Sequence, residues 1–95
     1  MRRPCVYILA SKRNGTLYVG VTANLARRMF EHRTEAVDGF TQRYGVHRLV
    51  HVDFLETMPE AIAREKQLKR WHCAWKLDLI EKNNPTWRDL YGEIQ

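Results

Sequence analysis

The stretch Thr16–Arg33, TLYVGVTANLARRMFEHR, changes from the pattern of a β-strand to that of an α-helix within eighteen letters. Residues 16–21 alternate between Thr, Tyr and Gly on one side and Leu, Val and Val on the other, which is the period of a strand. Beyond Gly20 the apolar residues take helical spacing, and Thr22 or Asn24 can cap that helix. The stretch therefore predicts a strand that leads directly into a helix.

A second strand is predicted immediately upstream, because residues 5–10, CVYILA, also alternate and are rich in strand-forming residues. The segment SKRNG separates the two runs, and its Asn14-Gly15 pair tolerates the positive φ of a tight turn. The two runs are therefore predicted to form a hairpin. Depending on register, Tyr7 and Tyr18 would lie on the same face of neighbouring strands.

The helix that follows has a predicted core stripe, placed by advancing about 100° per residue from the first apolar position. The stripe comprises Leu25, Ala26, Met29 and Phe30. Arg27 and Glu31 fall on the opposite, solvent-facing side. Arg28 and His32 are four residues apart and share one edge of the stripe. The burial of the helix is thus expected to hold Arg28, rather than Arg27, near the sheet.

Residues 34–47 carry mixed signals, mainly of loop, with a short turn of helix predicted at 41–44. Residues 48–55 alternate again and predict a third strand, with one face carrying Val50, Val52 and Phe54.

The rest of the chain is predicted to be helical. Pro59 suits the first turn of a helix that runs to about Arg70. Another helix is expected from about Trp71 until the sequence Asn83-Asn84-Pro85 stops it. A short terminal helix from about Thr86 completes the prediction.

Glu65 is the most unusual residue of the predicted helix 59–70, because it falls within the apolar side that Ala61, Ile62 and Leu68 mark. A carboxylate on the buried side of a helix is costly unless it is paired, hydrogen-bonded or bound to a metal. A single carboxylate suits Mg²⁺, which keeps most of its waters. Glu65 is therefore either a metal ligand, a partner of a lysine or arginine, or a residue at the exposed margin of the stripe.

Length and composition limit the class of protein. The chain has 95 residues, 44% of them hydrophobic, which indicates one globular domain. A net charge of +5 favours a polyanionic partner such as nucleic acid, although a basic protein without one has the same composition. Two cysteines fit a reducing compartment, and no apolar run approaches the roughly 20 residues of a membrane span. We therefore expect a cytoplasmic protein.

Phosphodiester hydrolysis matches the candidate residues. The reaction needs a group that accepts a proton from water, a cation for the charge of the transition state and, often, a divalent metal. Arg28 is permanently charged and matches phosphate in shape. A tyrosine with a pKa near 10 is a poor base at pH 7 unless an arginine or metal lowers that pKa.

The sequence resembles the GIY-YIG nuclease family, in particular its small stand-alone bacterial members. Two segments match the tripeptides of the family name: Cys5-Val6-Tyr7 and Tyr18-Val19-Gly20. In the first, cysteine replaces the glycine and valine replaces the isoleucine. VTANLARRMFEHR, residues 21–33, matches the arginine-bearing helix. AIAREKQLKRW, residues 61–71, matches the segment of the metal-binding glutamate, and NNPTW, residues 83–87, resembles a terminal motif.

The resemblance implies an α+β fold: a small three-stranded antiparallel sheet in β-β-α-β-α-α order, flanked by helices, with residues 1–95 as one domain. It implies that Tyr7, assisted by Tyr18 or His32, activates or orients water. Arg28 would stabilise the transition state. The resemblance further implies that Glu65 holds one Mg²⁺ or Mn²⁺ ion, and it leaves Asn84 as either an additional site residue or the end of a helix.

The expected activity is that of a metal-dependent DNA endonuclease acting on single-stranded or branched DNA. Family members usually take their target choice from an attached domain, which we do not expect here. Five basic residues are candidates for contact with nucleic acid: Lys12, Arg13, Arg43, Lys69 and Arg70. Trp71 and Trp75 are expected in the core. The alternative is a catalytically silent nucleic-acid-binding module of the same fold. A third interpretation, a protein that binds partners through its basic face, has less support in the sequence.

Overall fold

The computed structural model describes residues 3–12, 15–33, 45–46 and 48–93. Its elements follow in the order β1 (Cys5–Ala10), β2 (Leu17–Thr22), α1 (Leu25–Arg33), β3 (Arg48–Phe54), α3 (Met58–Arg70), α4 (Cys73–Asn83) and the 3₁₀ helix η1 (Leu90–Glu93). This order confirms the predicted α+β class and β-β-α-β-α-α arrangement. The terminal helix is shorter than expected and begins at Leu90. The helical turn predicted at residues 41–44 lies outside the described residues.

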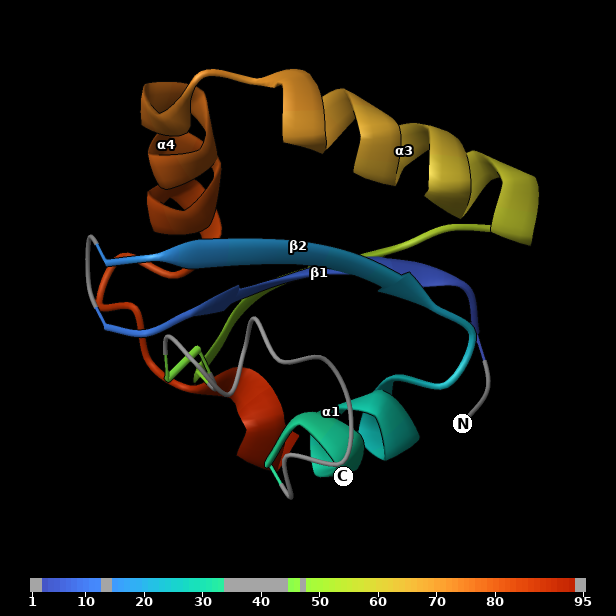
Figure 1. Ribbon diagram of the computed structural model, residues 1–95, viewed down its shortest axis with the longest axis horizontal. Coiled ribbons are helices and arrows are strands. Elements are labelled where there is room, and N and C mark those ends of the chain that lie inside the picture. Colours follow the sequence, from blue (N-terminus) through green and yellow to red (C-terminus); the bar gives the residue numbers. More distant parts are fainter. Residues whose placement is uncertain (1–2, 13–14, 34–44, 47, 94–95) are drawn as a thin grey trace.

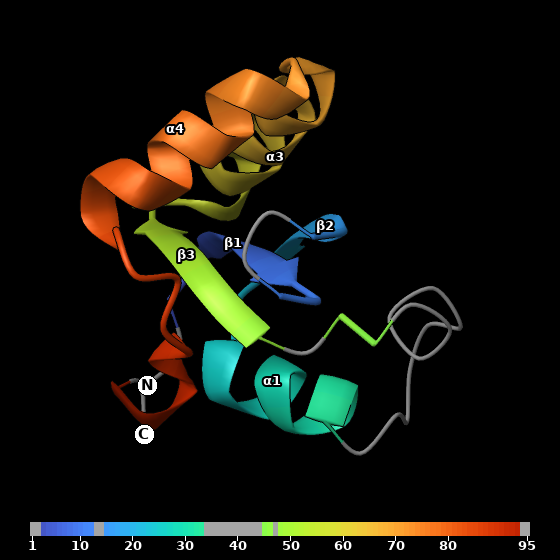
Figure 2. The same cartoon turned by 90° about the vertical axis from the view of Figure 1, so that its left-hand side faces the viewer.

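Within the described ranges, three strands form one antiparallel sheet in the order β2-β1-β3, so β1 is the central strand. Figure 1 shows α3 and α4 on one face of this sheet and α1 with η1 on the other. Figure 2 shows the same three layers along the side of the molecule. Every residue of β1 is buried, because its neighbours cover both edges and helices cover both faces.

The alternation of side chains along β1 divides the core into two clusters. The first, the α3–α4 core, contains Val6, Ile8, Ala10, Val19, Val50, Ala61, Leu68, Ile80 and Trp87. The second, the α1 core, contains Cys5, Tyr7, Leu9, Leu25, Met29, Val46 and Leu49. Tyr7 therefore points away from α3 and toward α1, and this orientation decides which residues it can meet.

The prediction that Val50, Val52 and Phe54 share one face of the third strand is wrong for Val50. Along β3 the pairing shifts between Ile8, which pairs with His51, and Leu9, which pairs with Leu49. Such a bulge inserts one extra residue into the strand and reverses the alternation beyond it. Val50 consequently joins the α3–α4 core, whereas Val52 packs against the α1 core.

α1 begins as the capping residues predict. The Oδ1 of Asn24 accepts a hydrogen bond from the backbone N–H of Arg27 at 3.3 Å, and the hydroxyl of Thr22 accepts one from the N–H of Asn24 at 3.1 Å. Within the predicted stripe, Leu25 and Met29 are buried, but Phe30 is 59% exposed. Phe30 stands about 140° from Leu25 around the helix, beyond the part of a short helix that the sheet can cover.

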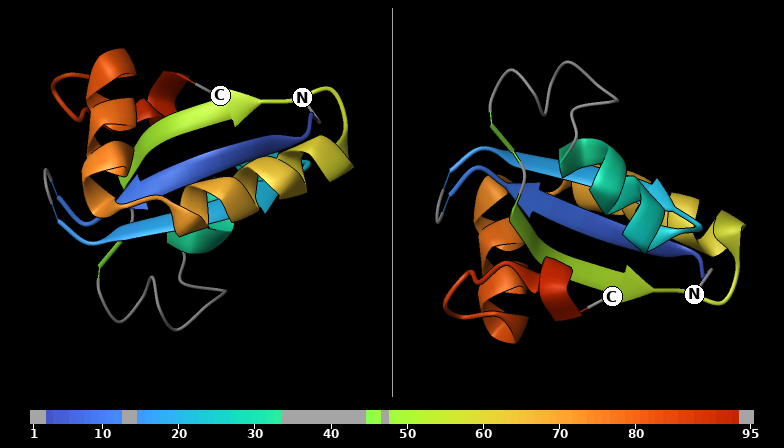
Figure 3. Two further views of the ribbon diagram at one scale, coloured as in Figure 1. Left: turned by 90° about the horizontal axis from the view of Figure 1, so that it is seen from above. Right: turned by 90° about the horizontal axis from the view of Figure 1, so that it is seen from below.

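α3 begins at Met58, one residue before the predicted start, with Thr57 as its N-cap. The Thr57 hydroxyl accepts from the N–H of Glu60 at 3.3 Å, which satisfies one of the first N–H groups of the helix, and it donates to the Glu60 carboxylate at 3.0 Å. The helix contacts β2 and β1, and Figure 3 (left) shows it crossing over β2. Arg64 also ties it to β3, because its Nε donates to Asp53 Oδ2 at 3.4 Å.

Across the part of the chain that the structure describes, no helix is both long enough and apolar enough to cross a membrane.

Candidate active site

Tyr7 lies directly opposite Gly20 in the β1–β2 ladder, and the absence of a side chain at Gly20 makes room for the tyrosine ring. A Cβ added at Gly20 would stand 2.4 Å from both Cζ and Oη of Tyr7, far inside van der Waals contact. The ring therefore lies across the backbone of β2, with its hydroxyl over the edge strand. A glycine is needed at this position for close packing rather than for an unusual backbone conformation.

Tyr18 pairs with Leu9 and so stands diagonally from Tyr7 on the same face of the sheet. The two ring centroids are 6.4 Å apart, with the planes tilted by 37°. This confirms the shared face that the hairpin predicts. Tyr7 is fully buried, whereas Tyr18 is half-buried.

Arg28 reaches from α1 to the same place. Its Nε donates a long hydrogen bond, 3.4 Å, to the phenolic oxygen of Tyr7. The side chain of Arg28 is 35% exposed, whereas that of Arg27 is 72% exposed. The prediction from helical spacing that Arg28, rather than Arg27, faces the sheet is confirmed.

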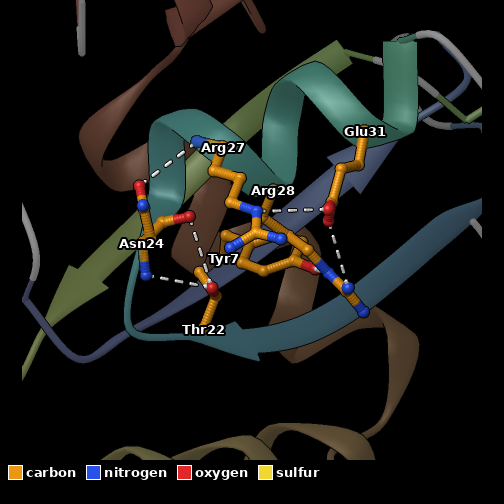
Figure 4. Close-up of polar contacts among 6 residues, drawn as sticks. All are labelled: Tyr7, Thr22, Asn24, Arg27, Arg28 and Glu31. Carbon is orange, nitrogen blue, oxygen red and sulfur yellow. Dashed lines mark hydrogen bonds and ion pairs between the residues drawn. The ribbon is translucent and has the colours of Figure 1, made fainter. Parts of the chain in front are cut away.

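Glu31 joins the two arginines. Its Oε1 lies 3.5 Å from Nη1 of Arg28, and its Oε2 lies 3.4 Å from Nε of Arg27, as Figure 4 shows. The helical wheel puts Glu31 on the solvent side and does not reveal this contact. The signal was present, since Glu31 follows the two arginines at i+4 and i+3, which is the spacing of helical ion pairs.

A cavity of about 380 Å³ opens beside this group of side chains, between the end of β2 and the first turns of α1. Its lining comprises Thr22, Ala23, Asn24, Arg27, Arg28 and Glu31. Two guanidinium groups and the start of a helix face it, so it suits a negatively charged group such as phosphate. From the sequence, Thr22 and Asn24 are recognisable as helix caps but not as part of this cavity.

Burial decides the ionisation of Tyr7. Removal from water raises its pKa from 10.0 to about 12, although the hydrogen bond from Arg28 acts in the opposite direction. The same hydrogen bond raises the pKa of the Arg28 guanidinium above its usual value. Arg28 therefore lowers the pKa of Tyr7, as expected of an arginine, but by less than burial raises it. At neutral pH Tyr7 is an uncharged phenol next to a cation.

Glu65 lies on α3, which covers the opposite face of the sheet from Tyr7 and Arg28. Its side chain is 17% exposed, and its Oε2 lies 3.3 Å from Nζ of Lys69. Of the sequence-based alternatives for Glu65, pairing with a lysine is the one observed. The residues that the structure describes contain no group of three or more His, Cys, Asp or Glu side chains placed to hold a metal. A single, partly accessible carboxylate still fits Mg²⁺, which is often held through one or two carboxylates and its own waters.

Asn84 is separate from the tyrosines. It follows the last residue of α4, is almost fully buried, and donates from Nδ2 to the backbone oxygens of Val50, at 3.2 Å, and Arg88, at 2.8 Å. Its Oδ1 accepts from the N–H of Arg88 at 3.2 Å. Both ends of the amide are thus engaged in joining α4, β3 and the segment that follows α4.

The remaining sequence-based candidates divide into described and undescribed residues. Lys12, Lys69 and Arg70 are exposed. The side chain of His32, together with Arg13 and Arg43, lies outside the described residues. The expectation of two core tryptophans is wrong for Trp75, which is 54% exposed, whereas Trp71 is half-buried against the α3–α4 core.

The fold gathers the Tyr7, Tyr18 and Arg28 side chains on one face of a small antiparallel sheet. Residues 3–78 match the family model of the GIY-YIG catalytic domain. The chain therefore belongs to the GIY-YIG family, a family of nucleases, as the sequence resemblance indicates.

The chain is similar to small bacterial proteins of this family. A UPF0213 protein of Syntrophus aciditrophicus is 33% identical over 84 residues, which cover 87% of this chain and 95% of the relative. A UPF0213 protein of Clostridium perfringens is 35% identical over 89 residues, which cover 94% and 95% of the two chains. The solution NMR structure of the UPF0213 protein BH0048 from Bacillus halodurans superposes with a TM-score of 0.57 at 25% identity, covering 92% of each chain.

Proposed function

We propose that this protein is a divalent-metal-dependent endonuclease that hydrolyses phosphodiester bonds of DNA, with residues 1–95 acting as one domain. Single-stranded or branched DNA is the favoured substrate, because its phosphates are accessible to a shallow site. The observation that carries the proposal is the contact between Arg28 and the buried hydroxyl of Tyr7, made possible by Gly20. It joins a proton-handling group and a permanent cation beside an anion-sized cavity.

Arg28 is proposed to stabilise the transition state. Hydrolysis of a phosphodiester concentrates negative charge on the non-bridging oxygens, and a guanidinium already fixed in place offsets that charge without reorganising. Glu31 and Tyr7 fix the guanidinium from two sides. Substrate phosphate would compete with Glu31 for this charge when it enters the cavity.

Tyr7 is proposed to orient the attacking water. Its hydroxyl is buried in the free protein, so the proposed role requires that substrate binding uncovers it. As an uncharged phenol at neutral pH, it can then donate a hydrogen bond to water while it accepts one from Arg28. Tyr18 or His32 is the proposed assistant in removing the proton from this water, and the proton then passes to bulk solvent. The ring distance between Tyr7 and Tyr18 supports the first of these.

Glu65 is the proposed ligand of one Mg²⁺ or Mn²⁺ ion. α3 crosses over the edge strand β2 (Figure 3), and the Tyr7 hydroxyl also lies over that strand, so the two sides of the site would meet around this edge of the sheet. An ion held there would supply positive charge to the leaving oxygen of the phosphodiester. Glu65 itself contributes the negative charge that attracts the cation, and it would exchange its contact with Lys69 for that role.

The test is incubation of the purified protein with labelled single-stranded, duplex and branched DNA in the presence of Mg²⁺, Mn²⁺ or EDTA. We expect cleavage with either metal and none with EDTA. Tyr7→Phe deletes one hydroxyl and keeps the packed ring, so it should bind DNA like the parent and cleave at least roughly tenfold more slowly. If the parent cleaves none of these substrates and Tyr7→Phe binds as tightly, the protein is instead a nucleic-acid-binding module.

A further inference from the structure

A second surface feature lies away from Tyr7 and Arg28, at the junction of α3 and α4. It is a groove of about 370 Å³, which is within the size range of small-molecule sites. Its lining comprises Trp71, Trp75, Asp78, Leu79 and Lys82. The four residues from α4 follow at intervals of three and four, so they form one face of that helix.

The aromatic rings of the groove are held by their neighbours. The ring of Trp71 packs against the α3–α4 core, and the guanidinium of Arg64 lies 5.2 Å from its centroid. Trp75 meets Trp71 edge-to-face at 6.0 Å and His72 at 5.3 Å, with interplanar angles of 85° and 90°. These contacts fix an indole that remains 54% exposed. A large, fixed apolar ring exposed to water is a feature of binding surfaces.

The surroundings of the groove are positively charged. Residues 64–82 contain six of the sixteen lysines and arginines of the chain and three carboxylates. Lys69 and Arg70 are exposed directly before Trp71, and Lys82 is part of the groove wall. An aromatic platform flanked by cations is how proteins bind single-stranded nucleic acid: bases stack on the rings and phosphates meet the charges.

We propose that this groove binds an unpaired base of a DNA strand, with the indole of Trp75 as the stacking platform and Lys82, Lys69 and Arg70 as contacts for the adjacent phosphates. The inference rests on the proposed function, because it assigns a second contact to the same substrate. From Glu65 to Trp71, the residue that caps the end of α3, the chain advances about 9 Å, roughly the length of three stacked nucleotides. A strand at the proposed metal ligand therefore reaches the groove within a few nucleotides.

Binding is measured in EDTA, where we expect no cleavage, by fluorescence anisotropy of two labelled strands. One is a short oligothymidylate and the other is an abasic strand of equal length and charge. Trp75→Ala should weaken binding of the oligothymidylate about fivefold or more and leave binding of the abasic strand unchanged. Trp75→Phe should retain part of the difference. Phe54→Ala, which removes an exposed aromatic ring at the far end of β3, is the matched control and should change neither affinity.

A second measurement needs no substitution. Trp87 is fully buried, so quenching of tryptophan fluorescence by the oligothymidylate, but not by the abasic strand, reports on Trp71 and Trp75. Equal affinity of parent and Trp75→Ala for the oligothymidylate, with no base-dependent quenching, would overturn the inference. A dimer in sedimentation that Trp75→Ala converts to a monomer would also overturn it, because the groove would then bind a second copy.

The two proposals fail separately. If the parent cleaves DNA and Trp75→Ala does not change binding, base binding in the groove is rejected and the nuclease activity stands. If Trp75→Ala loses base-dependent binding and the parent cleaves no substrate, base binding in the groove stands and the nuclease activity is rejected.

Discussion

The Nε of Arg28 donates to the phenolic oxygen of Tyr7 over 3.4 Å, joining the first helix to the central strand across 21 residues of sequence. Gly20 makes this contact possible, because the tyrosine ring occupies the space that any side chain there would fill. The relationship is specific to Arg28, since the Arg27 side chain points to solvent and pairs with Glu31 there, while its backbone N–H donates to the cap residue Asn24.

Arg28→Lys should therefore lower the rate of DNA cleavage roughly tenfold or more, because lysine keeps the charge but loses the planar fork. Arg27→Lys is the matched control and should change the rate less than about twofold, given its exposure. Single-turnover cleavage by the two variants at equal DNA occupancy is the measurement. Equal losses in both variants would mean that Arg28 has no special position in the site.

How far the sequence predicts this site depends on whether the signal is local. The hairpin, the shared face of Tyr7 and Tyr18, and the inward position of Arg28 all follow from local periodicity, and the structure confirms them. The face of Val50 was not predictable, because a bulge leaves the alternation of the strand letters intact. The bulge exists only in the pairing of two strands.

The exposure of two aromatic residues is not predictable for a different physical reason. A helical wheel gives direction around the axis but not the width of the surface that covers the helix. Phe30 of α1 and Trp75 of α4 are therefore assigned to the core by hydrophobicity, yet remain exposed because nothing in the described structure covers them completely. Only the tertiary arrangement decides such positions.

Gly20→Ala should destabilise the protein and reduce cleavage together. The added methyl group would collide with Cζ and Oη of Tyr7, and relieving such overpacking costs about 1–3 kcal/mol. Gly92→Ala is the matched control, because a Cβ there meets nothing within 4 Å. Thermal unfolding and cleavage rates of both variants are compared. Unchanged stability in Gly20→Ala would mean that the ring does not lie across β2.

The buried hydroxyl of Tyr7 also makes stability depend on alkaline pH. Its pKa is 10.0 when exposed and about 12 in the fold, mainly through burial. A raised pKa means that the folded state holds the proton more tightly, so this contribution is complete below pH 10 and is lost as pH rises toward 12. The free energy of unfolding should fall by about 1.4 kcal/mol per pH unit in that window, or about 2 to 3 kcal/mol in total.

Tyr7→Phe cannot titrate at this position, so its stability should fall less steeply over the same interval. Urea unfolding at intervals between pH 9 and 12 checks the slope. Burial likewise raises the pKa of Cys5 from 9.0 to about 11, so both proteins are compared in a Cys5→Ala background. Parallel slopes for tyrosine and phenylalanine would contradict the burial of the Tyr7 hydroxyl.

Glu65→Gln should abolish metal-dependent cleavage while leaving stability within about 1 kcal/mol of the parent. The change removes the proposed ligand charge and one ion pair with Lys69, and such i,i+4 pairs contribute only a few tenths of a kcal/mol. Glu56→Gln, at an exposed position before α3, is the control and should cleave normally. Calorimetric titration with Mn²⁺ gives a readout independent of activity. Parental cleavage by Glu65→Gln would exclude Glu65 as the ligand.

Substitutions of Asn84 and its neighbour Asn83 test whether Asn84 has a structural role or a role in the active site. Asn84→Ala leaves the buried backbone oxygen of Val50 and the partly buried one of Arg88 without their amide donor, which should cost about 1–3 kcal/mol of stability. Asn83 is exposed and its amide donates to the oxygen of Leu79 within its own helix, so Asn83→Ala should cost less than about 0.5 kcal/mol. Well below both melting temperatures, each variant should cleave DNA at the parental rate per folded molecule. Loss of cleavage in Asn84→Ala with unchanged stability would instead place Asn84 in the active site.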